Sequence, residues 1–217
     1  AGCRGEALVD RSRHAAARGA VKAGIAFLGT QQSPDGRFPS STYGLLKTGQ
    51  STTPFVVVSL LRLPPALRDE TSLRRALRSL MGLQKQGALG FATVAPDYPT
   101  YSTALALSGW MALPEEATEV SAATALAWLI ERQYGPEWAG HPAEGGWGMG
   151  QLKPPTPPHA GHVDLSMTRR TLQALVAAKL APAHEAFVAA RAFVGRCRAG
   201  AGFVYSPVDE ALNKGGC

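Results

Sequence analysis

The chain repeats one short pattern four times, at intervals of about fifty residues. Each copy is the end of a helical stretch followed by a Gly-rich turn that closes with an aromatic residue. The copies begin at residues 27, 80, 128 and 193, which gives spacings of 53, 48 and 65 residues. A period of this size indicates a supersecondary unit that cannot bury its apolar face alone and has to stack on its neighbours. We therefore expect a repeat protein.

Two kinds of residue mark the repeat. A Gln ends the helical stretch in the first three copies, where its side chain can hydrogen-bond to backbone groups at the helix end. The aromatic residue is expected to pack on the turn and to hold adjacent units together. The predicted structural repeat positions are Gln32, Gly36, Phe38, Gln84, Phe91, Gln133, Trp147 and Phe203.

Each period is predicted to contain two helices. The first is amphipathic, with apolar residues at helical spacing, as at Leu73, Leu77 and Leu80. The second is apolar on almost all sides and belongs inside, so the two kinds should form an outer and an inner layer. The inner helices are expected at residues 55–63, 104–113 and 171–180, and Thr residues occupy corresponding sites at or before them, at Thr53, Thr103 and Thr168.

Composition is that of an all-α globular protein, with 45% apolar and 18% charged residues. The net charge of +6 comes largely from Arg on the predicted outer faces. No nucleic-acid-binding motif accompanies this charge, so no nucleic acid is expected as a partner. The longest apolar run, at about 101–113, is too short to span a bilayer.

The chain is predicted to consist of two segments. Residues 1–15 are interpreted as a tail, and residues 16–217 as a partial repeat domain. Ala1-Gly2-Cys3 resembles the end of a bacterial lipobox, in which small residues precede a Cys that becomes lipidated. One hypothesis is therefore an exported, periplasmic or membrane-anchored lipoprotein with its lipid on Cys3. The alternative is that the tripeptide is coincidental and the protein is cytoplasmic.

Two sequence patterns resemble a known family. Lys22-Ala23, Phe27-Leu28, Gln32 and Gly36-Arg37-Phe38 together resemble the QW repeat of squalene and hopene cyclases. Asp164-Leu165-Ser166-Met167-Thr168 before an Ala- and Leu-rich helix is similar to the start of an inner helix in prenyltransferase and squalene-cyclase repeat proteins. The resemblance covers about residues 20–206. It implies an α/α toroid, in which two concentric rings of helices surround an apolar cavity. No inner helix follows the fourth outer one, so we expect this toroid to be incomplete at its C-terminus.

Neither chemistry of that family is predicted for this chain. The cyclases protonate an alkene with an Asp of a DxDD motif, and Tyr101 and Ser102 stand at the corresponding acidic positions. Protein prenyltransferases hold zinc with an Asp and with a Cys two residues later. Asp164 matches that Asp, but Ser166 stands in place of the Cys and is a poor ligand. We predict no catalytic residue, no metal and no cofactor.

The candidate cavity or rim residues are Tyr101, Trp147, His162, Asp164, Arg169 and Arg170. His162 and Asp164 end a Gly-, Pro- and His-rich loop at 134–163, and loops of this length are often functional. Asp164 is interpreted as a helix cap, with a metal or acid–base role as the alternative. Arg169 and Arg170 are candidates for binding a diphosphate, or else face solvent and pair with acids.

Three functions remain open at this point. The first is a binding protein whose apolar central cavity takes an isoprenoid-like ligand, or whose surface takes a protein partner. The second is a terpene cyclase or prenyltransferase whose catalytic motif lies in a C-terminal half outside this sequence. The third is a carbohydrate-active α/α-toroid enzyme, which would need paired acids in the cavity.

Overall fold

The computed structural model describes residues 3–91, 95–151 and 153–213, and it describes side chains from residue 15 onward except at position 45. Within these residues the protein is helical, and its one sheet is a short two-stranded hairpin. The prediction of an all-α protein is confirmed at this level. The arrangement of these helices as an incomplete α/α toroid stays a prediction.

Outer and inner helices alternate along the chain. The outer helices are α1 (Cys3–Gln31), α3 (Glu70–Met81), α5 (Glu119–Glu131) and α7 (Glu185–Arg196). The inner helices are α2 (Thr52–Leu61), α4 (Pro99–Ala112) and α6 (Leu165–Ala177). The hairpin pairs β1 (Arg198–Ala199) with β2 (Gly202–Phe203). The short 3₁₀ helices are η1 (Gly44–Leu46), η2 (Pro65–Leu67), η3 (Pro114–Glu116), η4 (Pro136–Trp138) and η5 (Glu210–Leu212).

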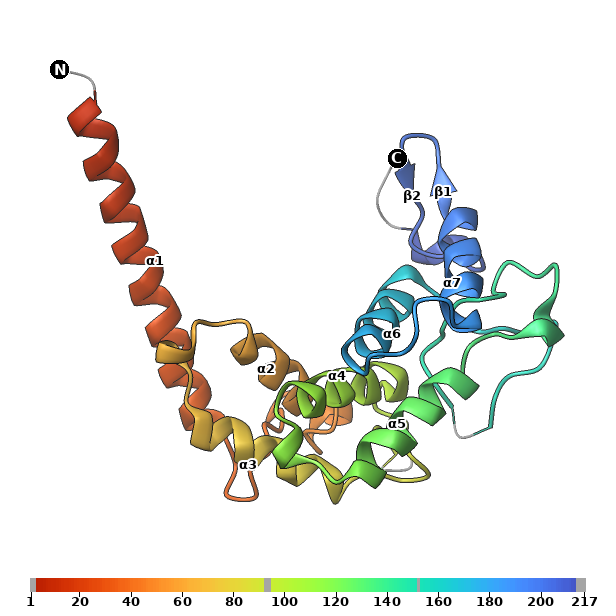
Figure 1. Ribbon diagram of the computed structural model, residues 1–217, viewed down its shortest axis with the longest axis horizontal. Coiled ribbons are helices and arrows are strands. Elements are labelled where there is room, and N and C mark those ends of the chain that lie inside the picture. The colour runs from red at the N-terminus through yellow and green to blue at the C-terminus, as the bar shows by residue number, and fades with distance from the viewer. Residues whose placement is uncertain (1–2, 92–94, 152, 214–217) are drawn as a thin grey trace.

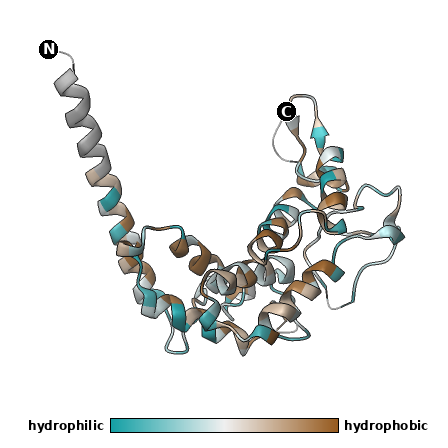
Figure 2. Ribbon diagram, viewed as in Figure 1, coloured by the Kyte–Doolittle hydropathy of each residue, from teal (hydrophilic) through white to brown (hydrophobic). Residues whose placement is uncertain are grey.

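The inner helices form a curved row, with α4 between α2 and α6, while α3 and α5 pack on its outer side (Figure 1). Apolar residues are concentrated in the inner helices, and polar residues gather on the outer side of α3 (Figure 2). Helix α1 extends away from the arc at one end (Figure 1). It runs without a break across residue 15, where the sequence suggested that a tail meets the repeat domain.

The burial of each helix follows from its place in the row. Helix α4 packs against α2, α3, α5 and α6 and buries ten of its residues, including Leu107 and Trp110. The Trp110 indole N–H donates to the Leu77 carbonyl of α3 at 3.2 Å. Helix α3 buries one stripe that contains Leu73, Leu77 and Leu80, as its sequence predicts, and Asp69 caps its first turn.

Each repeat Gln joins two consecutive units. The Gln84 amide donates to the Gly87 carbonyl of its own turn at 3.1 Å and to the Ser121 carbonyl in the first turn of α5 at 2.9 Å. The predicted bond to backbone groups is therefore confirmed, and one of those groups belongs to the next unit. We call this arrangement the glutamine clamp. The equivalent pairs of acceptors are Gly36 and Ser72 for Gln32, and Gly145 and Ala186 for Gln133.

The glycine of each clamp lies against the next outer helix. Gly145 has a φ of +79°, and a Cβ on it would lie 2.2 Å from the Ala189 carbonyl oxygen of α7. Any side chain would therefore both strain the backbone and push the units apart. Gly36 and Gly87 repeat this contact with the Arg75 and Thr124 carbonyls, each at 2.6 Å.

A threonine of each inner helix completes the connection. The residue two positions after the clamp glycine donates its backbone N–H to this hydroxyl. The three bonds are Phe38 to Thr53 at 2.8 Å, Leu89 to Thr103 at 2.9 Å, and Trp147 to Thr168 at 3.2 Å. The structural counterpart of Phe38 and Trp147 is therefore Leu89, and the equivalence predicted for Phe91 is wrong by two residues.

The fourth copy does not form a clamp. Arg198 stands at the position of the Gln, and the turn is the β1–β2 hairpin. Phe203 is 58% exposed, whereas Phe38, Phe91 and Trp147 are buried. The prediction of a packed aromatic is therefore wrong at Phe203, because its turn has no following outer helix to pack on within the described residues.

We expect Gln84→Glu to lower the free energy of unfolding by about 2 kcal/mol, because a carboxylate would face two carbonyl oxygens instead of donating to them. Gln86→Glu is the matched control, since Gln86 is an exposed neighbour, and it should change stability by less than about 0.5 kcal/mol. Urea titration followed by circular dichroism measures both. Equal losses would contradict the clamp.

We expect Phe91→Ala to cost about 3 kcal/mol, the usual price of deleting a buried aromatic. Phe91 makes an edge-to-face contact with Trp128 of α5, with ring centroids 6.3 Å apart. Phe203→Ala removes the same ring from an exposed position and should cost less than about 1 kcal/mol. Thermal unfolding measures the stability of both variants. A larger loss of stability for Phe203→Ala than for Phe91→Ala would contradict the prediction.

Candidate functional site

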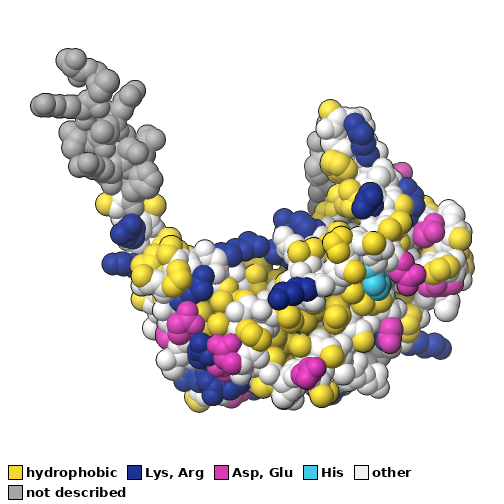
Figure 3. Space-filling view, in the orientation of Figure 1, with side chains coloured by type: hydrophobic (Ala, Val, Ile, Leu, Met, Phe, Trp, Pro, Cys, Tyr) yellow, Lys and Arg dark blue, Asp and Glu magenta, His cyan; other side chains and the backbone are white. Residues whose placement is uncertain are grey.

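The N-terminal ends of the three inner helices surround a hollow of about 430 Å³, which we call the inner-helix groove. Its lining residues come from all three of these helices and from the loops beside them. They are Leu46, Ser51, Thr52, Phe55, Tyr98, Tyr101, Ser166, Met167 and Tyr205. Phe55, Tyr98 and Tyr205 are exposed, although large aromatic side chains usually avoid water. Hydrophobic side chains gather in the hollow of the arc, with Lys and Arg side chains around them (Figure 3).

One wall of the groove carries a polar network. The Arg170 Nε–H donates to the Tyr101 hydroxyl at 3.1 Å, and the Arg170 guanidinium lies 5.6 Å from the centre of the Tyr101 ring. The Tyr101 hydroxyl also lies 3.4 Å from the Ser166 hydroxyl. Two of the sequence candidates, Tyr101 and Arg170, are thereby brought into contact.

The two tyrosines of this region differ in acidity. Burial by itself would raise the pKa of Tyr101, but hydrogen bonds with Ser166 and Arg170 and the charges of Arg170 and Arg169 outweigh it. The pKa of Tyr101 therefore lies below its ordinary value. Burial, and then the negative charge of Asp164, raise the pKa of Tyr205. Tyr101 is thus the better hydrogen-bond donor of the two.

Asp164 is fully buried and caps α6, as predicted. One carboxylate oxygen accepts the Met167 backbone N–H at 2.8 Å, and the other pairs with His162 Nε2. A carboxylate at this helix end also benefits from the helix dipole. With both oxygens occupied, Asp164 acts as a structural residue that fixes the start of α6 beside the groove.

Asp97 is an acid whose burial the sequence analysis missed. It precedes α4, it is fully buried, and one oxygen accepts the Ser51 hydroxyl at 2.6 Å. Its second oxygen has no hydrogen-bond partner among the described residues. Burial is the main cause that raises the pKa of Asp97 above its ordinary value. The sequence signal is weak, because an acid two residues before a helical Pro is usually solvated.

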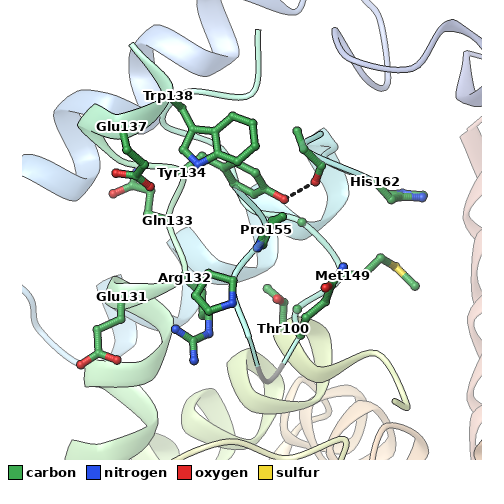
Figure 4. A pocket seen from close by; sticks show the side chains of 15 residues that line it. Thr100, Glu131, Arg132, Gln133, Tyr134, Glu137, Trp138, Met149, Pro155 and His162 are labelled. Carbon is green, nitrogen blue, oxygen red and sulfur yellow. Dashed lines mark hydrogen bonds between the residues drawn. The ribbon is translucent and has the colours of Figure 1, made fainter. Parts of the chain in front are cut away.

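The long loop at 134–163 shares a second, smaller core with α7. Tyr134 and Trp138 make an edge-to-face contact at 4.8 Å, and the Tyr134 hydroxyl donates to the Ala160 carbonyl at 2.5 Å. Figure 4 shows these two rings beside a cavity of about 130 Å³ that Arg132 also lines. The labelled ring of His162 points away from this cavity (Figure 4). None of the residues that line this cavity also lines the inner-helix groove, so the two hollows are separate.

The remaining sequence candidates lie elsewhere. Trp147 is fully buried, and its indole N–H donates to the Leu129 carbonyl at 2.7 Å, so it belongs to the core and the rim position is wrong. Arg169 is exposed on α6 and lines a different hollow, so it is not part of the lining of the inner-helix groove. Cys3 begins α1, and its side chain lies outside the described residues.

No group of three His, Cys, Asp or Glu side chains in the described part of the chain is arranged to hold a metal ion. None of the helices in that part combines the length and the apolar character that crossing a membrane requires.

Comparison with known protein families, with curated proteins and with solved structures finds no match for this chain. The resemblance to prenyltransferase and squalene-cyclase repeats therefore rests on the residues quoted above.

We expect Asp97→Asn to stabilise the fold increasingly as the pH rises above 3.8, the ordinary pKa of Asp. The raised pKa means that the folded state favours the protonated form, so the native protein loses stability as the pH rises through the folded pKa. Unfolding titrations from pH 4 to pH 8 measure this difference. Asp35→Asn is the control: hydrogen bonds from Arg37 and Ser33 hold the pKa of Asp35 below its usual range, so this substitution should lower stability by an amount that changes little from pH 4 to pH 8. A pH-independent difference for Asp97→Asn would contradict the prediction.

Proposed function

We propose that the protein binds an elongated apolar molecule of isoprenoid-like size in the inner-helix groove. The supporting observation is that aromatic side chains from separate repeats, three of them exposed, converge on one hollow. Phe55 comes from the start of α2, Tyr98 and Tyr101 from the start of α4, and Tyr205 from the loop that contacts α6. Such a surface gains free energy when an apolar chain removes it from water.

The polar network at one wall suggests how a ligand would be oriented. Tyr101 and Ser166 line the groove, and Arg170 holds the Tyr101 hydroxyl in place. A ligand with a hydroxyl or another acceptor at one end could hydrogen-bond there while its chain lies on Phe55. Interactions of this kind fix orientation and contribute selectivity more than they add affinity.

Binding is favoured over catalysis by the residues at hand. The described lining of the groove contains no Asp or Glu. Asp164 uses both oxygens within the protein, and Asp97 lies outside the lining. Protonation of an alkene and acid–base cleavage of a glycoside both need a carboxyl group at the substrate. A cyclase, a prenyltransferase or a carbohydrate-active enzyme would need that group from residues beyond these.

The family assignment is part of the same proposal. The glutamine clamps, the apolar inner row and the outer helices support a repeat unit of the prenyltransferase and squalene-cyclase type, arranged as part of an α/α toroid. In that arrangement the inner-helix groove would face the central cavity. Lipid anchoring through Cys3 and export remain predictions.

Binding of radiolabelled farnesol by equilibrium dialysis tests the proposal. We expect Phe55→Ser to weaken binding about tenfold, because Phe55 is half exposed in the groove and its ring would contact the chain. Val120→Ser is the matched control, since Val120 is 70% exposed on the outer helix α5. An unfolded Phe55→Ser variant is not expected, and circular dichroism checks this. Absence of binding to the unaltered protein, or equal losses in both variants, would overturn the proposal.

A further inference from the structure

Helices α6 and α7 leave a second apolar hollow on the opposite side of α6 from α4. It consists of two adjoining spaces of about 550 and 700 Å³ that share Leu172, Val176 and Val194. We call it the α6–α7 groove and define it by Leu165, Leu172, Val176, Phe187, Val194 and Phe203.

Two apolar side chains of the groove are more than half exposed. Val176 is 65% exposed and Phe203 is 58% exposed. A continuous apolar surface on a soluble protein commonly marks a site of interaction. The repeat itself indicates the shape of the occupant.

The same kind of groove is already filled twice in this structure. Helix α4 lies against α2 and α3, and helix α6 lies against α4 and α5. Each pair consists of an inner helix and the outer helix that follows it. Helices α6 and α7 are the next such pair, and they also pack against each other. The occupant that fits this position is therefore an α-helix with an apolar surface.

The charges around the groove restrict that helix further. Arg169, Lys179 and Arg191 line it, and all three are exposed. The described lining contains no Asp or Glu. A helix with acidic residues beside its apolar stripe would pair with these cations, whereas a basic helix would be repelled.

We propose that the α6–α7 groove binds an α-helix of a partner protein, with an apolar stripe against Val176 and acidic residues on both sides of the stripe. This recognition is a helix-in-groove contact. It does not depend on the ligand proposed for the inner-helix groove, which lies at the N-terminal ends of the inner helices.

The probe is a capped synthetic peptide of the length of α4, with Leu along one face and Glu on both flanks. Its binding to the full chain is measured by fluorescence anisotropy. We expect Val176→Glu to weaken binding of the peptide about tenfold, because it places a charge in the apolar lining of the α6–α7 groove. Val188→Glu is the matched control. Val188 is 57% exposed on α7 but does not line the groove, so its effect should be less than about twofold.

A charge exchange tests the second half of the proposal. Arg191→Glu should weaken binding of the Glu peptide and strengthen binding of a peptide that has Lys at the same positions. The reason is that Arg191 is exposed and lines the groove. No binding of the Glu peptide, equal effects of Val176→Glu and Val188→Glu, or equal binding of both peptides would each overturn the proposal.

Light scattering of the unaltered chain distinguishes a different occupant. If the chain forms a dimer that Val176→Glu converts to a monomer while Val188→Glu does not, the groove holds a second copy and the partner-helix proposal is wrong. A monomer that binds the Glu peptide supports it.

Discussion

The structure depends on a repeated interaction in which one Gln side-chain amide donates hydrogen bonds to two backbone carbonyls. In each glutamine clamp, the Gln at the end of an outer helix holds its own turn and the first turn of the next outer helix. The adjacent glycine permits this contact because even a methyl group would collide with the neighbouring carbonyl. The threonine of the inner helix then fixes the same turn from the inside. Stacking is thereby specified by hydrogen bonds, while apolar burial supplies most of the driving force.

This arrangement explains where the candidate site lies. The clamp turns and the starts of the inner helices are joined by the bonds to Thr53, Thr103 and Thr168. The inner helices are therefore held near their N-terminal ends in the same way, and residues of their first turns come together although they are far apart in the sequence. Tyr101 and Ser166 meet for this reason.

The sequence was sufficient for features that depend on local periodicity. The stripe of Leu73, Leu77 and Leu80 and the cap at Asp164 were predicted from spacing alone, and both are confirmed. Features that depend on how the helices pack against each other were not predicted correctly. Phe91 follows a glycine, as the repeat pattern requires. In the structure, however, Gln84 bonds to Gly87, and Leu89 occupies the position that Phe38 and Trp147 occupy in the other repeats.

The same limit applies to the candidate site. Tyr101 could be chosen because it lies in the first turn of an inner helix, and Arg170 because it lies in the second turn of another. Their contact depends on how α4 and α6 pack, which no local pattern encodes. The burial of Asp97 likewise depends on Ser51 from the preceding repeat.

The clamp also allows turns of different length to produce the same stacking of repeat units. Gln and Gly are four residues apart in the first clamp, three in the second and twelve in the third. All three clamps nevertheless make the same pair of bonds, because only the two ends of the turn are held. Closing a longer loop costs little additional entropy. New segments can thus be inserted between Gln and Gly without changing how the units stack, which makes this turn a natural place for such a protein to acquire new surface.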